Sequence, residues 1–160
     1  MLNLRIYPDP VLRQKCEEVN PTDNLNLIFE RMEEIMKEKE GVGFSAPQIG
    51  ILKRLIVVKM NDEFVRLVNP EIIEGEGEEV CEEGCLSLPD VYLEIKRYQR
   101  VKVRGFTPEG VEREIIAEGL PARAFQHEID HLNGILIIDH IPAEEKIDIL
   151  MTYKYKAGTI

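Results

Sequence analysis

The chain has 160 residues, of which 44% are hydrophobic and 31% are charged, an ordinary composition for one globular domain spanning residues 1–160. Its formal net charge of −10 disfavours a general nucleic-acid-binding protein, because phosphate contacts require a basic surface. The sequence contains no apolar stretch of membrane-spanning length and no leader-like apolar segment near its start, so we expect a cytoplasmic protein outside the membrane.

The first expected element is an amphipathic helix from Asn24 to Lys39. Gly41 is placed to end this helix, since glycine often follows the last helical turn. Apolar residues recur along it at helical spacing, which predicts one face packed on the core. These residues are Leu25, Ile28, Phe29, Met32, Ile35 and Met36.

Strands dominate the middle of the chain, after the glycine-rich "GVGFSAPQIG" of residues 41–50. The predicted strand segments are rich in β-branched residues and are separated by Gly, Pro, Asn and Asp. A second helix is expected from Pro121 to about Gly134, and a final helical segment from Ala143. The strand segments are residues 54–60, 64–73, 91–106 and 110–119.

The second helix carries the pattern H-E-x-x-H as His127, Glu128 and His131. Two histidines four residues apart on a helix can hold one metal ion, while the glutamate next to the first histidine reaches a water bound to that metal. The structural alternative is a surface helix with two incidental histidines. Two imidazoles also leave the metal site incomplete, so a third ligand must come from elsewhere.

A zinc peptidase is the simplest reading of this pattern, and the downstream sequence tests it. The extended peptidase motif needs a third histidine three residues after Gly134, where this chain has Ile137. A glutamate ligand would have to be Glu144 or Glu145. Both stand in a charged run that is explained more simply as a solvated surface, so neither completes the site convincingly.

Cys85 is the better candidate for the third ligand. It follows a glycine in "EEGCLSLPD", residues 82–90, which we expect to be a loop that presents the thiol for ionisation as a metal-bound thiolate. A buried structural cysteine is the alternative, and we assign that role to Cys16 and Cys81. The three cysteines have no C-x-x-C spacing that would indicate a disulfide framework.

The glycine-rich segment alone is weak support for a functional site, because G-x-G usually marks a turn. In combination, G-V-G-F-S-A-P-Q (41–48), E-G-C-L-S (83–87) and Q-H-E-I-D-H (126–131) resemble peptide deformylase. The N-terminal "IYPDPVLR" is also similar to that family. The resemblance implies an α+β fold in which antiparallel β-sheets pack around a central metal-binding HExxH helix, with an N-terminal amphipathic helix.

The same resemblance implies roles for individual residues. Cys85, His127 and His131 match the metal ligands, and Glu128 matches the catalytic acid and base. Such a His₂Cys site leaves a fourth position for a water, whose pKa the metal lowers toward neutrality. The oxyanion donors would be Gln48 and the backbone N–H of Leu86. The backbone at Val42, Gly43 and Gly84 would line the substrate peptide, which would bind as an added strand. The methionine pocket would include Val42, Leu120 and His127.

In the family, the substrate is an N-formyl-methionyl polypeptide and the products are formate and a free amino terminus. The resemblance implies one Fe2+ per chain, with Zn2+, Ni2+ or Co2+ as substitutes, whereas ligand type alone favours Zn2+. No specific nucleic acid or membrane partner is expected. The final "TYKYKAGTI" is too short for the long C-terminal helix through which some members dock on the ribosome, so docking is not assumed.

Several positions depart from the family pattern or leave alternatives open. Ser45 stands where alanine is more usual and should be tolerated, whereas Arg123 and Ala124 stand where some members carry apolar residues that wall the methionine pocket. Asp130 either orients a ligand together with Arg97 or is a solvated charge. His140 is expected to be structural. Two alternative functions remain for the whole protein, namely an endopeptidase and a metal-stabilised binding module.

Overall fold

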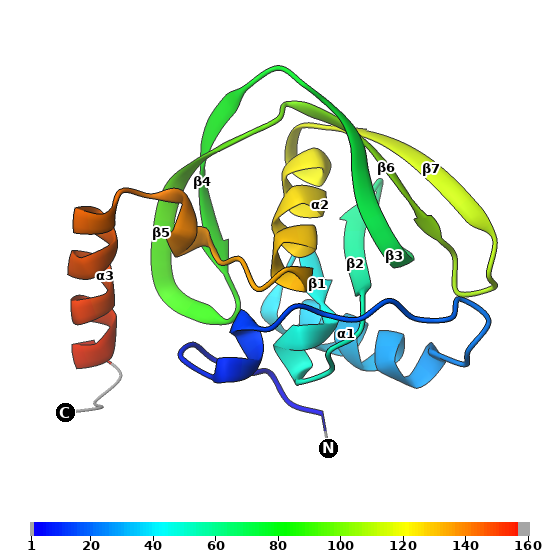
Figure 1. The fold of residues 1–160 in the computed structure, drawn as a ribbon, viewed down its shortest axis with the longest axis horizontal. Coiled ribbons are helices and arrows are strands. Elements are labelled where there is room, and N and C mark those ends of the chain that lie inside the picture. Colours follow the sequence, from blue (N-terminus) through cyan, green and yellow to red (C-terminus); the bar gives the residue numbers. More distant parts are fainter. Residues whose placement is uncertain (1, 157–160) are drawn as a thin grey trace.

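Helix α2 lies at the centre of the fold in the computed structural model, which describes residues 2–156 (Figure 1). One side of α2 packs on a five-stranded sheet, and a two-stranded hairpin lies on the other side. All the strand pairs in both sheets are antiparallel, which confirms the expected α+β class. The elements are α1 (Asn26–Lys39), α2 (Gly119–Leu132), α3 (Ala143–Lys156), β1 (Gly43–Ser45), β2 (Leu55–Met60), β3 (Glu63–Glu76), β4 (Glu79–Cys85), β5 (Leu88–Arg97), β6 (Arg100–Phe106) and β7 (Glu112–Glu118), with short 3-10 helices η1 (Pro10–Arg13), η2 (Ala46–Ile49) and η3 (Ile137–His140).

Strand β2 is buried on both faces because helices cover both sides of the sheet at this point. The sheet has the order β1-β2-β3-β6-β7. Ile56 and Val58 belong to the core that β2 shares with α2, while Leu55 and Val57 belong to the core that it shares with α1. Successive strand residues point to opposite faces, so a continuous apolar run is what a doubly covered strand needs.

Helix α1 contributes one apolar stripe to the core beneath the sheet. Phe29, Met32, Ile35 and Met36 are buried at helical spacing. Gly41 was expected to end the helix, but the capping residue is Glu40, which adopts a left-handed conformation with φ 54°. The Gly41 N–H instead donates a hydrogen bond to the Met36 carbonyl at 2.9 Å. The chain thereby turns directly into β1.

The hairpin of β4 and β5 forms a third core with η1, η3 and α3, which lie near the two ends of the chain. Leu93 and Ile95 of β5 pack with Leu12 of η1 and Ile138 of η3, and α3 lies along the outer side of the hairpin (Figure 1). The sequence prediction missed β4, because residues 82–90 were expected to form a loop. Residues 91–106, expected as one strand segment, divide into β5 and β6, which belong to different sheets.

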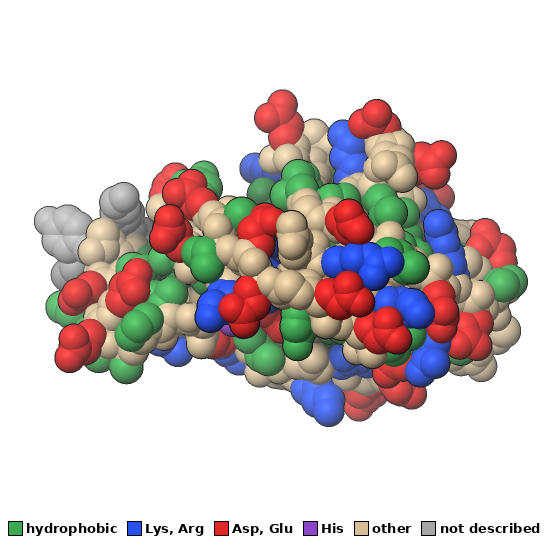
Figure 2. Space-filling view, turned by 90° about the horizontal axis from the view of Figure 1, so that it is seen from above, with side chains coloured by type: hydrophobic (Ala, Val, Ile, Leu, Met, Phe, Trp, Pro, Cys, Tyr) green, Lys and Arg blue, Asp and Glu red, His purple; other side chains and the backbone are tan. Residues whose placement is uncertain are grey.

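Exposed charges pair across neighbouring strands of the five-stranded sheet. Arg104 of β6 contacts Glu71 of β3 and Glu112 of β7, and Lys102 contacts Glu74. Acidic and basic side chains are also interspersed over the face shown in Figure 2. None of the helices in the described part of the chain has both the length and the apolar composition needed to cross a bilayer. The end of "TYKYKAGTI", residues 157–160, lies outside the described residues.

Candidate metal centre

Cys85, His127 and His131 come together beside the central helix. Their candidate ligand atoms all lie within 4.8 Å of one another, and Cys85 Sγ is 3.3 Å from His131 Nε2. His127 and His131 are one helical turn apart on α2, so their side chains share a face. Cys85 is the last residue of β4 and is presented by a strand end, which corrects the expected loop.

A buried carboxylate, Glu83, fixes the orientation of His127. His127 Nδ1 is 3.0 Å from Glu83 Oε1, so Nδ1–H donates to the carboxylate and Nε2 is the ring nitrogen left for the cluster. Burial alone would raise the pKa of Glu83, but hydrogen bonds from Arg97 and His127 bring it well below its usual range. The carboxylate is therefore charged, and it holds the imidazole in the tautomer that a metal ligand requires.

Glu83 is the main site residue that the sequence analysis missed. Side chains alternate along a strand, so residues 83 and 85 of β4 share a face. That alternation would have placed Glu83 beside Cys85 if the segment had been recognised as a strand. A loop has no such alternation, and the residue therefore looked like one of several surface acids.

The charges around the cluster favour a bound cation. Burial opposes the protonation of His127, but Glu128, Cys85 and Glu83 together raise its pKa well above the usual value. Burial keeps the pKa of His131 well below its usual value, so His131 is neutral and able to act as a ligand. Within residues 2–156, two buried polar atoms of this site have no hydrogen-bond partner, namely Glu128 Oε1 and His131 Nδ1. A thiol and two imidazoles next to a free carboxylate oxygen fit a four-coordinate metal ion with one open position.

Glu128 lies at the inner end of the cavity, against the backbone of β1. Its side chain is buried, and burial raises its pKa to about 7, although the neighbouring His127 opposes this rise. A carboxyl group with a pKa near neutrality can both accept and release a proton at physiological pH. Gly43 packs so closely on this carboxylate that a larger residue there would displace it.

Ser45 sets the direction in which the Gln48 amide points. Gln48 Oε1 accepts hydrogen bonds from the Ser45 backbone N–H at 3.0 Å and from Ser45 Oγ at 2.9 Å. Its Nε2 donor group is therefore directed to the opposite side, where it lies 3.1 Å from Ser87 Oγ and 3.9 Å from Cys85 Sγ. The hydroxyl of Ser45 is thus not merely tolerated, because it adds a bond that an alanine could not make.

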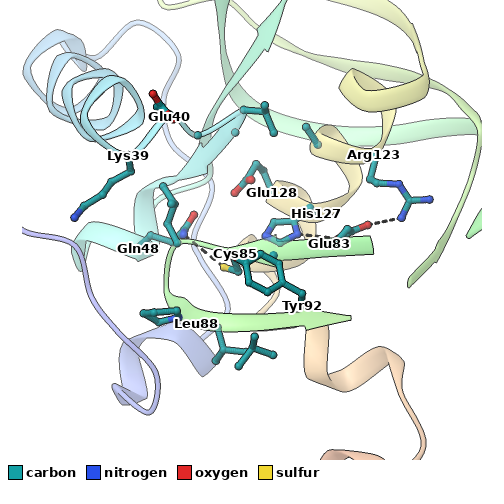
Figure 3. A pocket seen from close by; sticks show the side chains of 18 of the residues that line it. Lys39, Glu40, Gln48, Glu83, Cys85, Leu88, Tyr92, Arg123, His127 and Glu128 are labelled. Carbon is teal, nitrogen blue, oxygen red and sulfur yellow. Dashed lines mark hydrogen bonds and ion pairs between the residues drawn. The ribbon is translucent and has the colours of Figure 1, made fainter. Parts of the chain in front are cut away.

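The cluster opens onto a cavity of about 510 Å³. Figure 3 shows Gln48, Cys85, His127 and Glu128 around this cavity. Gly43 of the edge strand β1 and Gly84 of β4, which pairs with β5, lie on its two sides. The expected site residues that line it are Val42, Gly43, Gln48, Gly84, Cys85, Leu86, Leu120, His127 and Glu128; His131 lies behind them, buried beside Cys85.

Arg123 does not point its charge into the cavity. Its guanidinium is directed into the β4–β5 hairpin, toward Glu83 (Figure 3). Asp130 accepts a hydrogen bond from Arg97 at 2.6 Å, and Arg97 in turn holds Glu83, so Asp130 is connected to the candidate ligand His127 through two intermediate side chains. His140 Nε2 lies 2.9 Å from the same Asp130 carboxylate, on the outer side of this network.

The other two cysteines lie outside the cluster. Cys16 is buried in the core that the sheet shares with α2, where burial raises its pKa to about 11. Cys81 is half-buried, which corrects the expected buried position, and its Sγ lies 3.0 Å from the carboxylate of Glu79. Glu144 and Glu145, the ligands that a peptidase reading would need, are exposed on α3 and are not members of the cluster.

Known proteins resemble this chain in sequence and in fold. The family model described as Polypeptide deformylase matches residues 1–147. The peptide deformylase of Thermotoga petrophila is 46% identical over 149 residues, which cover 92% of this chain and 91% of that protein. A crystal structure of a peptide deformylase from Legionella pneumophila superposes with a TM-score of 0.91 at 35% identity, covering 99% of this chain and 97% of that one. The class I type b enzyme of Acinetobacter baumannii, solved with Met-Ala-Ser bound, has a TM-score of 0.83 at 37% identity and covers 88% and 98%.

Proposed function

The chain belongs to the polypeptide deformylase family, and on that premise we propose that Cys85, His127 and His131 hold the metal ion and that Glu128 moves the protons of the reaction. Members of this family are metal-dependent enzymes that remove the N-formyl group from new polypeptides. The observation that carries the proposal is the meeting of the three candidate ligands beside a buried carboxylate.

The donor set supports a single metal ion per chain. When bound, the ion would act as a Lewis acid that activates water for attack on the formyl carbon. We assign Fe2+ as the ion used in the cell, with Zn2+, Ni2+ and Co2+ as substitutes, because cellular availability can outweigh the higher affinity of such ligands for zinc. Glu83 supports the site by keeping the Nδ1 proton of His127 in place.

Glu128 would take a proton from the attacking water and deliver it to the departing amine, so that water and the formyl amide become formate and a free amino terminus. One carboxyl group can perform both transfers because burial brings its pKa to about 7. The attack places negative charge on the formyl oxygen. The side-chain amide of Gln48 and the backbone N–H of Leu86 would donate hydrogen bonds to that oxygen.

The formyl-methionyl peptide would bind as an added strand between β1 and β4. The backbone at Val42, Gly43 and Gly84 lines this part of the cavity, and main-chain hydrogen bonds recognise a peptide regardless of its sequence. Val42, Leu120 and the ring of His127 would surround the methionine side chain. The Met-Ala-Ser bound to the relative from Acinetobacter baumannii is the product that a formylated Met-Ala-Ser substrate would leave.

The same proposal covers the whole chain and its place in the cell. Residues 1–160 would form one catalytic domain, and the enzyme would act in the cytoplasm, where new polypeptides appear. No contact with nucleic acid, membrane or ribosome is needed for the reaction as described.

Formate release from formyl-Met-Ala-Ser tests this function, measured under anaerobic conditions with Fe2+ or with Ni2+. An N-acetylated peptide with cleavable internal bonds is the control substrate, because an endopeptidase would hydrolyse it. We expect formate from the first and no cleavage of the second. Cleavage of the acetylated peptide at a comparable rate would instead support an endopeptidase, and metal binding without either activity would support a binding module.

A further inference from the structure

We propose that Arg123 is a positioning residue that holds Glu83 against His127 and thereby strengthens metal binding; this inference rests on the metal site proposed above. Arg123 stands where an apolar residue would wall the methionine pocket in some relatives. In this chain Arg123 lines the cavity, but its guanidinium is directed to the β4–β5 hairpin. The buried charge of Arg123 therefore acts on the hairpin and not on the contents of the cavity.

All the hydrogen bonds of the Arg123 guanidinium reach the β4–β5 hairpin. Nη1 donates to Glu83 Oε2 at 2.6 Å and to the Ile95 carbonyl at 2.8 Å, and Nη2 donates to the Glu79 carbonyl at 2.7 Å. Three acceptors in these directions match the planar fork of an arginine, which a lysine ammonium cannot reproduce. The side chain is only 7% exposed, so these bonds are protected from water.

Arg123 joins the two elements that supply the candidate ligands. Arg123 and His127 are one turn apart on α2, while Glu83 and Cys85 are two residues apart on β4. A bond from Arg123 to Glu83 therefore fixes the distance between the helix face that carries His127 and the strand face that carries Cys85. Figure 3 shows Glu83 between His127 and Arg123, with contacts to both.

The Glu83 carboxylate accepts hydrogen bonds from three side chains. Arg97 holds it with Nε and Nη2, both at 2.9 Å, and His127 Nδ1–H shares Oε1 with one of these donors. Arg97 comes from the hairpin itself, and its own link to α2 runs through Asp130, whose side chain is 24% exposed. Besides the candidate ligand His127 itself, Arg123 supplies a buried link between Glu83 and α2.

The test measures the affinity of the folded protein for Zn2+ by competition with a chromogenic chelator. Arg123→Met keeps the length of the aliphatic stem and removes the donors, and we expect it to bind Zn2+ about 10-fold more weakly, the lower end of the usual cost of losing a partner of a ligating histidine, because Glu83 keeps its bonds to Arg97. Arg123→Lys keeps the charge without the fork and should show a smaller weakening, about 3-fold or more. Arg104→Met, which removes only exposed ion pairs on β6, should leave the affinity unchanged.

Thermal unfolding of the same variants separates positioning from a purely structural role. A lower melting temperature with unchanged Zn2+ affinity in Arg123→Met would overturn the proposal, and unchanged affinity in Arg123→Lys would do so if Arg123→Met does not fold. Cys85→Ala is measured in parallel. If Cys85→Ala binds Zn2+ as tightly as the wild type, the metal site itself is wrong and the role of Arg123 falls with it. If only Cys85→Ala loses affinity, the metal site stands and the role of Arg123 is refuted.

Discussion

A β carbon placed on Gly43 would lie 2.7 Å from Glu128 Oε2, closer than two such atoms can approach. Gly43 begins the edge strand β1, and Glu128 is buried on α2, so the backbone of the strand packs directly against the carboxylate that we propose as the acid and base. A glycine at this position thus sets where the carboxylate sits. The absence of a side chain at Gly43 is therefore a requirement of the proposed site.

Gly43→Ala should therefore displace the Glu128 carboxylate without removing any proposed ligand. We expect kcat for formyl-Met-Ala-Ser to fall by about 10²-fold, the usual cost of misplacing a reacting group by about 1 Å, while metal content stays near one per chain. Gly41→Ala is the matched control, because its added methyl group would meet the end of the Leu86 side chain at 3.2 Å. It should cost less activity. Equal losses in both variants would contradict the close fit to Glu128.

Gln48→Ala should lower kcat much more than it raises KM. A donor aimed at the oxyanion strengthens its bond only as charge develops, and losing one such donor costs about 10² to 10³ in kcat. Gln48→Glu should be at least as damaging, because it places negative charge next to the developing oxyanion. Ser45→Ala should lose less than either, because the Ser45 backbone N–H still holds Gln48 Oε1. Near wild-type kcat in both Gln48 variants would show that the glycine-rich segment is only a turn.

Metal content should depend on one cysteine of the three. Cys85→Ala removes a proposed ligand, and we expect elemental analysis to show a sharp loss of metal. Cys16→Ala and Cys81→Ala should retain about one metal per chain, because neither thiol lies in the ligand cluster. Stoichiometric metal in Cys85→Ala would refute the ligand assignment.

Asp139 should contribute to stability in a pH-dependent way. Burial acts to raise its pKa, but hydrogen bonds from Arg13, the Leu136 N–H and Lys146 lower it to about 2. A carboxyl group of this kind stabilises the fold above its unfolded-state pKa of about 3.9, and this contribution is lost as the pH falls toward 2. The difference in urea midpoint between the wild type and Asp139→Asn should therefore be largest at pH 6 and smaller at pH 3. A constant difference would contradict the lowered pKa.

Local spacing was enough to predict which candidate site residues lie together on one helix. His127, Glu128 and His131 follow from the period of a helix, and a buried apolar face of α1 follows from the same period. Strand β4 was harder to predict, because "EVCEEGC" lacks the alternation of apolar and polar residues that marks a half-buried strand. Its pairing with β5 depends on contacts that local sequence does not display.

The direction in which a buried polar side chain points also could not be predicted from the sequence. Arg123 was considered only as a residue of the pocket wall, since the carbonyls that accept from it lie 28 and 44 residues away along the chain. Glu83 was missed for the same reason. Its partners Arg97, Arg123 and His127 come from two other elements, and only the packing of α2 on the hairpin brings them together.

The most direct test of the proposed mechanism is a paired measurement on Glu128→Ala, in which metal content and formate release from formyl-Met-Ala-Ser are determined on the same sample. The carboxylate is expected to move protons without binding the metal, so the variant should retain about one metal per chain and lose nearly all turnover. Parallel loss of metal and turnover would make Glu128 a structural part of the site. Turnover near the wild-type rate with the metal retained would contradict the mechanism.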